Sequence, residues 1–351
     1  MTDPNGGSLR QKSVGKYAYL AGVCILFLMI AAGLKMWTDP GNRLLRRNKE
    51  PLVQSGFLFD TVISVSLYDN QKQEILDGAF ALCRRYEDIC SPSRRDSELF
   101  RMNHRGAGVT VWKTDSELPD IVRLGLEYSE KTDGAFDLTV QPLSELWDFR
   151  SGKAQVPEEA KIREAVKKID YRRVSVEQGC IRFQDDQTQI DIGAVAKGFI
   201  ADRIKEYLLS QGVGSAIINL GGNVLCVGEK PGGEAFQIAI RKPERESSEV
   251  VKRLSVRDQS VVTSGIYERC FDLNGVHYHH ILDPKTGMPY QNGLSSVTIV
   301  GPSSGICDAL STSCFSLGEE KGMKLLDGTD GYYGYMIRLD GSIRASAGAP
   351  E

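Results

Sequence analysis

Residues 190–204 read IDIGAVAKGFIADRI, which joins a strand end, a glycine turn and the first turns of a helix. The pattern predicts a strand that stops before Gly193 and a helix that starts at about Ala194. Unpaired N–H groups at a helix start favour an anion, and Lys197 adds a positive charge one turn in. The turn is therefore a candidate pyrophosphate cradle, although a tight turn with a solvated lysine is an equal alternative. It is not a Walker A loop, because GxxxxGK[ST] is absent.

On both sides of this turn, strand and helix patterns are mixed. Alternating apolar residues predict strands, and apolar residues recurring at three and four predict helices. The expected strands cover 63–67, 174–183 (a hairpin), 215–220, 236–240 and 295–300, and the expected helices cover 75–89, 118–131, 157–168, 194–210 and 305–317. Because these elements do not alternate strictly, we expect an α+β fold of mixed sheets with packed helices and no boundary between separate globular domains.

The N-terminal part contains one long apolar stretch, residues 17–37, with Lys35 as its only charge. About 20 apolar residues span a bilayer as a helix. We expect a disordered cytoplasmic tail over 1–16, a transmembrane helix or signal anchor over 17–37, a linker over 38–55 and a globular domain over 56–345. A cleaved signal peptide, a buried core helix and lipidation at Cys24 are competing interpretations. The basic residues flanking the stretch slightly favour a C-terminus inside the cell.

The bulk composition excludes some classes of partner. The 351-residue chain has a net charge of −3, and its globular part has no stripe of lysines and arginines, so a nucleic-acid partner is not expected. Its eight cysteines form no CxxC pair, which gives no support to a zinc or thioredoxin-type site. The scattered cysteines are typical of small buried apolar residues.

Residues 307–315 read CDALSTSCF and hold two hard oxygen ligands. Asp308 and Thr312 are four apart on an expected helix, so both side chains face the same way. A carboxylate and a hydroxyl on one face suit magnesium. The competing interpretation is that Asp308 caps the helix or complements its dipole.

Three of the four histidines cluster beside the segment YHHILDPKTGMP, residues 278–289. His277, His279 and His280 lie near Asp283, and a histidine next to a carboxylate can take a proton from an attacking hydroxyl. Alternatively, His277 and His279 lie along a strand and only one of them points inward. The spacing matches no standard set of zinc ligands.

Two further segments combine aromatic and polar residues. Residues 132–149, TDGAFDLTVQPLSELWDF, surround Asp137 with aromatic and apolar side chains. They suit the wall of a flat ring system, but composition alone favours a core. In residues 263–271, TSGIYERCF, a Ser-Gly turn suits a phosphate contact, while Tyr267 and Arg269 suit packing or pairing.

Taken together, these segments resemble the ApbE family of FAD:protein FMN transferases. The resemblance rests on their content and order along residues 57–326, nearly all of the globular chain. The matching segments are FDTVISVSLY, SELFRMN, GAFDLTVQPLSELWDF, IDIGAVAKG, INLGGN, SGIYER, HHILDPKTG and CDALSTSCFSLG. The resemblance implies an α+β, T-fold-like domain that binds FAD in a cleft.

The resemblance also assigns roles to individual residues. The implied contacts to FAD are Phe59, Ser93, Ala135, Phe136, Asp137, Asp191, Lys197 and Ile281. The implied magnesium ligands are the backbone carbonyl of Ala194 and the side chains of Asp308 and Thr312, and the implied catalytic histidine is His280. Many family members have an aromatic residue in the loop before SELFRMN, where this chain reads SPSRRD. Ser93 stands in that region, which leaves a stacking contribution from this position open.

The implied reaction is a magnesium-dependent transfer of FMN from FAD to a Ser or Thr hydroxyl of a partner protein, with release of AMP. Family partners work in extracytoplasmic electron transfer, so we expect a single-pass membrane protein with its catalytic domain outside the cytoplasm, against the mild charge bias noted above. Two alternatives remain. One is an FAD pyrophosphatase that gives free FMN and AMP, and the other is an FAD-binding protein without turnover.

Overall fold

The computed structural model describes residues 50–244 and 249–350. The chain divides into two units, residues 1–50 and residues 51–351, and the second unit contains every helix and strand described below. The tail expected over 1–16, the membrane helix expected over 17–37 and most of the linker expected over 38–55 lie outside the described residues. Within 50–244 and 249–350, no helix is both long enough and apolar enough to cross a bilayer.

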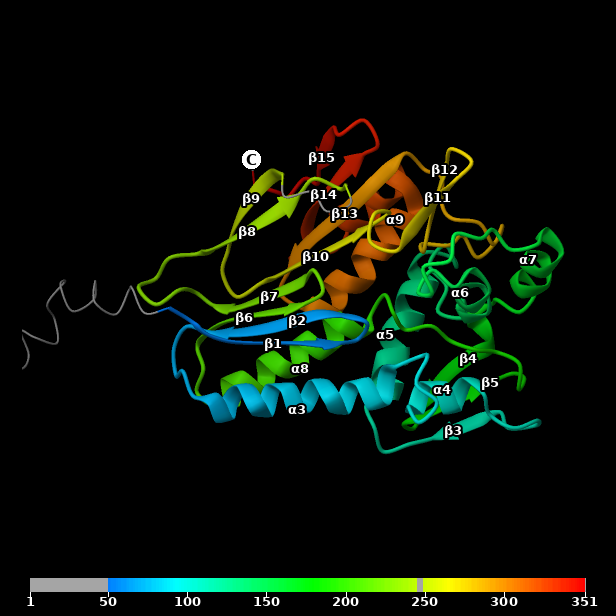
Figure 1. The fold of residues 1–351 in the computed structure, drawn as a ribbon, viewed down its shortest axis with the longest axis horizontal. Coiled ribbons are helices and arrows are strands. Elements are labelled where there is room, and N and C mark those ends of the chain that lie inside the picture. The colour runs from blue at the N-terminus through cyan, green and yellow to red at the C-terminus, as the bar shows by residue number, and fades with distance from the viewer. Residues whose placement is uncertain (1–49, 245–248, 351) are drawn as a thin grey trace, which may run out of the picture. The chain divides into compact units, whose positions relative to one another are not determined.

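The second unit is built on an eight-stranded sheet in which every described pair of neighbours is antiparallel. In spatial order its strands are β1 (Leu52–Leu58), β2 (Thr61–Leu67), β6 (Ser215–Leu220), β7 (Asn223–Gly228), β10 (Ser260–Gly265), β13 (Leu294–Gly301), β14 (Tyr333–Arg338) and β15 (Ile343–Ala345). Figure 1 shows how the first two strands lie beside β6, which follows them in the chain only after several helices. This arrangement brings the distant polar segments to one sheet.

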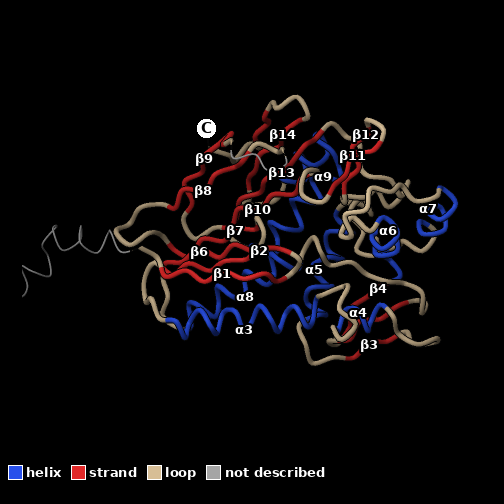
Figure 2. Tube along the Cα trace, in the orientation of Figure 1, coloured by secondary structure: helices blue, strands red, loops and turns tan. Residues whose placement is uncertain are grey.

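Three long helices pack against this sheet: α3 (Gln73–Cys90), α8 (Ala196–Ser210) and α9 (Ser304–Asp327). Figure 2 shows α3 and α8 running alongside β1 and β6. Their apolar faces and the inward side chains of the strands form the main core. In α3, for example, Ile75, Ala79 and Tyr86 are buried at helical spacing, as the sequence pattern predicts.

A second hairpin forms another apolar cluster with the sheet. It consists of β8 (Phe236–Arg241) and β9 (Val250–Val256). Phe236, Leu254 and Val256 pack with Val300 of β13 and Tyr335 of β14. Every residue of β13 is buried. Its sequence is accordingly a continuous run of apolar and small residues, without the alternation of a strand that has one face in solvent.

Most of the remaining elements lie between α3 and α8 in the chain, and one further hairpin follows β10. They are α4 (Glu98–Asn103), α5 (Leu118–Lys131), α6 (Gln141–Trp147), α7 (Glu159–Val166), the 3-10 turn Tyr171–Arg173, the three-stranded sheet of β3 (Val111–Lys113), β5 (Cys180–Phe183) and β4 (Val174–Glu177), and the hairpin of β11 (Cys270–Leu273) and β12 (Val276–His279). The α+β prediction is confirmed, and the expected helix 118–131 has the predicted bounds. The expected helix 305–317 matches the first part of α9, which is interrupted by a kink at the non-helical Gly318 before helical structure continues to Asp327.

Candidate active site

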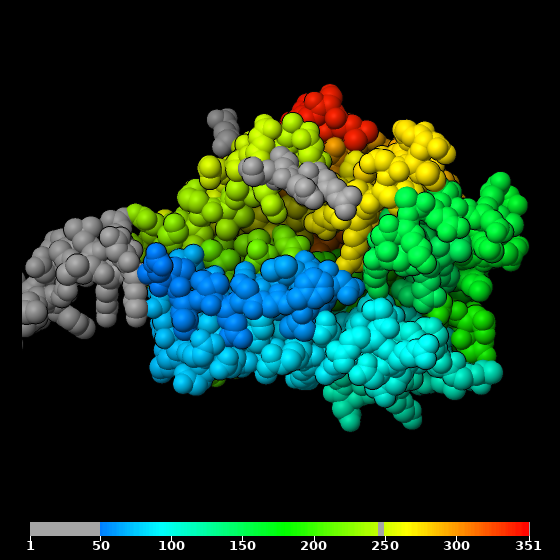
Figure 3. Space-filling view, viewed as in Figure 1, coloured from blue at the N-terminus to red at the C-terminus, as the bar shows by residue number. Residues whose placement is uncertain are grey.

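A cleft of about 950 Å³ lies within the second unit. Its volume is at the upper end of the range for small-molecule sites. Figure 3 shows the surface hollowed between the β1–β2 hairpin, the β8–β9 hairpin and the segment around β11 and β12. The sequence-predicted residues that line it are Phe59, Ala135, Phe136, Asp137, Asp191, Ala194, Lys197, His280, Ile281, Asp308 and Thr312. Segments separated by more than two hundred residues therefore meet in one concave site.

The turn before α8 is held by its own polar groups. One carboxylate oxygen of Asp191 accepts a hydrogen bond from the Gly193 N–H (2.8 Å), and the other accepts one from the Ser144 hydroxyl (2.8 Å). The Lys197 ammonium donates to the Gly193 carbonyl (3.2 Å) and also lines the cleft. The predicted strand before this turn does not form, since 190–192 belong to no strand, and α8 begins at Ala196 rather than at Ala194.

The contact between α8 and α9 requires a glycine. A Cβ atom at Gly198 would lie 2.2 Å from the Ser304 carbonyl oxygen, which is far inside van der Waals contact. The carboxylate of Asp202 accepts hydrogen bonds from the backbone N–H groups of Ser304 (2.8 Å) and Gly305 (2.9 Å). The start of α9 is therefore fixed against α8 by a close backbone approach and by a carboxylate.

Asp308 does not cap its own helix, α9. The cap of α9 is Ser303, whose hydroxyl accepts from the Ile306 N–H, and Asp308 lies one turn further in. Its carboxylate accepts a hydrogen bond from the Gly198 N–H of α8 (2.9 Å), and its side chain is only 3% exposed. Burial raises the pKa of Asp308, while Lys197 and the Gly198 N–H act in the opposite direction. The carboxylate thus lies at the start of α8, at the floor of the cleft.

Thr312 completes a cluster of hydroxyl groups beside Asp308. Its hydroxyl lies 2.9 Å from that of Ser264, which in turn lies 2.7 Å from that of Ser311. In the described part of the chain, Asp308 forms no ion pair, and no group of three or more His, Cys, Asp or Glu side chains is placed to hold a metal. The Asp308 carboxylate, the Thr312 hydroxyl and the Ala194 carbonyl belong to residues that line the same cleft, and all three are hard oxygen donors. This set fits magnesium, which is held by few protein ligands, and does not fit zinc.

Of the three clustered histidines, only His280 lines the cleft. Its Nδ1 is buried without a hydrogen-bond partner among the described residues. Burial lowers the pKa of His280 to about 3, and the neighbouring Arg269, His279 and Lys197 charges add to the effect. The imidazole is therefore neutral at physiological pH, and one of its nitrogens is available to a ligand in the cleft.

The other two histidines have structural partners. His279 is buried and its Nε2 lies 2.9 Å from the Tyr290 carbonyl oxygen. His277 is half-exposed, with Nδ1 2.8 Å from an Asp272 carboxylate oxygen. Of this pair only one points inward, which is the alternative that the sequence left open.

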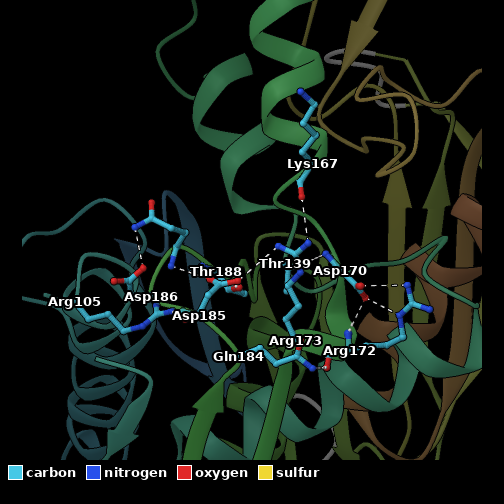
Figure 4. A network of polar contacts seen from close by, with 11 residues as sticks. Arg105, Thr139, Lys167, Asp170, Arg172, Arg173, Gln184, Asp185, Asp186 and Thr188 are labelled. Carbon is cyan, nitrogen blue, oxygen red and sulfur yellow. Dashed lines mark hydrogen bonds and ion pairs between the residues drawn. The ribbon is translucent and has the colours of Figure 1, made fainter. Parts of the chain in front are cut away.

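Asp137 shapes the wall of the cleft through contacts within the protein. One of its oxygens accepts from the backbone N–H (2.7 Å) and the hydroxyl (2.6 Å) of Thr139, and the other accepts from the Tyr171 N–H (3.0 Å). Figure 4 shows the network continuing from Thr139 to Asp170, which pairs with Arg172. Both carboxylate oxygens are therefore engaged within the protein, and they tie the backbone at Thr139 to the backbone at Tyr171.

The tip of the β1–β2 hairpin forms the opposite rim. Phe59 and Asp60 are the two central residues of a tight turn, with φ of 56° and 58°. Positive φ is uncommon for residues other than glycine, and such outliers cluster at functional sites. The Phe59 N–H donates to a carboxylate oxygen of Glu87 in α3 (2.9 Å), which holds the turn in place.

Ser93 is the one predicted site residue that the structure does not bring to the cleft. It is exposed, and its hydroxyl lies 3.4 Å from that of Ser91 in the loop after α3. A contact between Ser93 and FAD remains a prediction.

The charged residues that line the cleft and that sequence reasoning missed include Glu268 and Arg241. The surrounding protein raises the pKa of Glu268 by desolvation, although Lys197 and Arg269 counteract it. The segment 263–271 was already a candidate phosphate contact, and its Ser-Gly turn was the signal that could have found Glu268. Arg241 ends a strand and carries no motif of its own.

The fold and this cleft define a flavin-transferase class of protein, and comparison with known proteins agrees. The chain belongs to the ApbE family, whose family model matches residues 59–337. It is 36% identical over 288 residues to the FAD:protein FMN transferase of Treponema pallidum (strain Nichols), a match that covers 78% of this chain and 79% of the relative. It is also 36% identical over 274 residues to an FAD:protein FMN transferase of Klebsiella pneumoniae (strain 342), covering 78% of this chain and 84% of the relative.

Solved structures give the same result for the fold. The flavin transferase ApbE from Vibrio cholerae superposes with a TM-score of 0.77 at 27% identity, over 85% of this chain and 97% of that one. The ApbE protein from Thermotoga maritima gives a TM-score of 0.77 at 28% identity, over 85% and 97% of the two chains. The family and the ApbE-like fold expected from the sequence are therefore confirmed.

Proposed function

We propose that this chain is an FAD:protein FMN transferase, which moves FMN from FAD to a Ser or Thr hydroxyl of a partner protein in the presence of Mg²⁺. The observation that carries the proposal is the meeting of Lys197, His280 and Asp308 in one cleft of a chain that belongs to the ApbE family. The relatives named as FAD:protein FMN transferases support the same activity.

The side chains of Asp308 and Thr312 and the backbone carbonyl of Ala194 would hold Mg²⁺. When bound, the ion neutralises pyrophosphate charge and stabilises the charge that develops in phosphoryl transfer. The hydrogen bond from the Gly198 N–H orients the Asp308 carboxylate, and burial excludes competing water from it.

The transfer itself requires one bond to form and one to break. The acceptor hydroxyl oxygen bonds to the FMN-side phosphorus, the bridging P–O bond breaks, and AMP leaves with the bonding electron pair. The hydroxyl proton passes to the neutral imidazole of His280, a step that contributes about 10²–10⁴-fold for a well-placed base. The phosphates of bound FAD offset the charges of Lys197 and Arg269, which raises the basicity of His280 when substrate is present.

The proposal extends to the location of the reaction. The apolar stretch 17–37 would anchor the chain in a cell membrane as a single span, with the catalytic domain outside the cytoplasm. Fusion of a reporter to the C-terminus tests this arrangement. Activity of a reporter that works only in the cytoplasm would contradict it.

The experiment that tests the activity uses residues 50–351 with FAD, Mg²⁺ and a small protein that carries a Ser/Thr acceptor segment. Mass spectrometry then looks for a gain equal to FMN less water on the acceptor. We expect this adduct, and we expect EDTA to prevent it. Free FMN and AMP without an adduct would favour an FAD pyrophosphatase, and intact FAD after long incubation would favour a binding protein without turnover.

A further inference from the structure

The outer face of the β1–β2 hairpin carries an exposed pair of apolar side chains, which we call the hairpin patch. It consists of Phe57 and Val62, which are direct cross-strand partners in the register of β1 and β2. The residue Phe57 is 70% exposed and Val62 is 66% exposed. Adjacent large apolar side chains on a surface mark an interaction site more often than isolated ones do.

The hairpin patch is continuous with the rim of the active-site cleft. Val62 lines the cleft together with Asp60 and Thr61, whereas Phe57 lies one position outward and does not line it. Any molecule whose reactive group enters the cleft past this rim therefore passes over Val62 and reaches Phe57.

The tip that carries the patch is held rigidly. On one side the Phe59 N–H donates to Glu87 of α3 (2.9 Å). On the other side the turn between β6 and β7 approaches closely, because a Cβ atom at Gly221 would lie 2.5 Å from the Thr61 hydroxyl oxygen. The patch is thus fixed relative to the cleft before any partner arrives, as a docking surface requires.

The edge of the sheet points to the kind of partner. In the described sheet β1 is a terminal strand, so one side of its backbone has no neighbouring strand. An extended segment can add to such an edge, where backbone hydrogen bonds supply affinity and alternate side chains supply specificity. On the proposed function FAD would occupy the inside of the cleft, and the second substrate is a protein whose hydroxyl would reach the phosphorus from the rim.

We propose that the hairpin patch is the docking surface for the acceptor protein, which packs an apolar side chain on Phe57 and Val62 while its Ser or Thr enters the cleft. This inference rests on the proposed transferase function. It assigns acceptor recognition to the rim of the cleft and the exposed face beyond it, so substitution of Phe57, which does not line the cleft, separates acceptor affinity from FAD affinity.

The test is Phe57→Gln in the full-length chain, compared with Phe57→Leu and with Val53→Gln. Val53 lies on the same face of β1 and is 50% exposed, but it is about 13 Å away along the strand. Initial rates of FMN transfer are measured against the concentration of the acceptor protein, and FAD affinity is measured separately from flavin fluorescence. We expect Phe57→Gln to raise the acceptor KM roughly tenfold, the size of effect typical of a central aromatic contact, with kcat and FAD affinity close to wild type. Phe57→Leu and Val53→Gln should change KM less than threefold.

A second measurement separates docking from chemistry. The same acceptor with its hydroxyl residue changed to Ala is bound to the FAD-loaded enzyme, and Phe57→Gln should weaken this binding to the same degree as KM. Equal binding by wild type and Phe57→Gln would overturn the inference while leaving the transferase function intact. Conversion of a dimer to a monomer by Phe57→Gln would assign the patch to a second copy and would also overturn it. Absence of any adduct with wild type would remove the proposed function, and the inference with it.

Discussion

The contact between α8 and α9 yields a prediction with an unusual sign. In an isolated helix, Gly→Ala stabilises by about 1 kcal/mol. In this protein we expect Gly198→Ala to destabilise, because the new Cβ would lie 2.2 Å from the Ser304 carbonyl oxygen and 2.7 Å from the Gly305 Cα. These are backbone atoms, so no side-chain rotation relieves the overlap, and one helix must shift by about 1 Å to restore ordinary contact.

The magnitude follows from two destabilising contributions and one stabilising one. Overpacking costs about 1–3 kcal/mol, and weakening the hydrogen bond from the Gly198 N–H to the Asp308 carboxylate costs roughly 1.5–3 kcal/mol more. After subtracting the gain in helix propensity, the free energy of unfolding should fall by about 3 kcal/mol. With an m-value of about 3 kcal/mol/M, the urea midpoint falls by about 1 M.

The assay combines urea denaturation with a titration of FMN transfer against Mg²⁺. Because the shift displaces Asp308 relative to Ala194, the Mg²⁺ concentration for half-maximal transfer should also rise. Gly305→Ala is the matched control, since its Cβ would meet chiefly the Leu124 side chain at 3.1 Å, which can move aside. If Gly198→Ala were as stable as wild type and kept its Mg²⁺ dependence, the reasoning about this helix contact would be refuted.

Three other predictions concern single side chains. His280→Ala should slow FMN transfer by about 10²–10⁴-fold with FAD binding retained, whereas His277→Ala should transfer at nearly the wild-type rate; an unchanged rate in His280→Ala would exclude it as the base. Since burial holds the pKa of His280 at about 3 in the enzyme without FAD, its protonation should not produce an acid limb near pH 6.5 in kcat/KM for FAD, and a limb there that disappears in His280→Ala would contradict the assigned burial. Arg338 and Arg344 lower the pKa of Glu319 to about 2 from an ordinary 4.5, so its contribution to stability is present above about pH 5 and lost as the pH falls towards 2. Glu319→Gln should therefore flatten that part of the curve of unfolding free energy against pH. An unaltered slope would contradict this role of Glu319.

Much of the site was predictable because it resides in short local segments. The i, i+4 spacing of Asp308 and Thr312 placed both side chains on one helix face. Lys197 lies in the first turn of α8, as predicted, although this helix begins at Ala196, two residues later than expected. The order of these motifs was sufficient to indicate the family. Local pattern and motif order are properties of the sequence itself, so no tertiary information was needed.

The remainder depends on contacts between distant residues. The hydrogen bond from Gly198 to Asp308 joins residues 110 positions apart, and no local pattern distinguishes it from a helix cap. Likewise, the aromatic-rich segment around Asp137 fitted a ring-binding wall, although its composition alone favoured a core. The structure shows that its carboxylate is engaged by Thr139, two residues further along the chain, and by Tyr171, which becomes a neighbour only in the folded chain.

The same distant contact explains why the site can hold a buried carboxylate. A desolvated Asp308 is costly unless donors or cations face it, and the start of α8 supplies both a backbone N–H and the positive end of a helix dipole. This leaves part of the cost uncompensated, as the raised pKa of Asp308 indicates. Binding of a divalent cation would remove the rest. On the proposed function, a bound Mg²⁺ would offset the remaining cost of burying Asp308, and it would couple the stability of the α8–α9 contact to magnesium concentration.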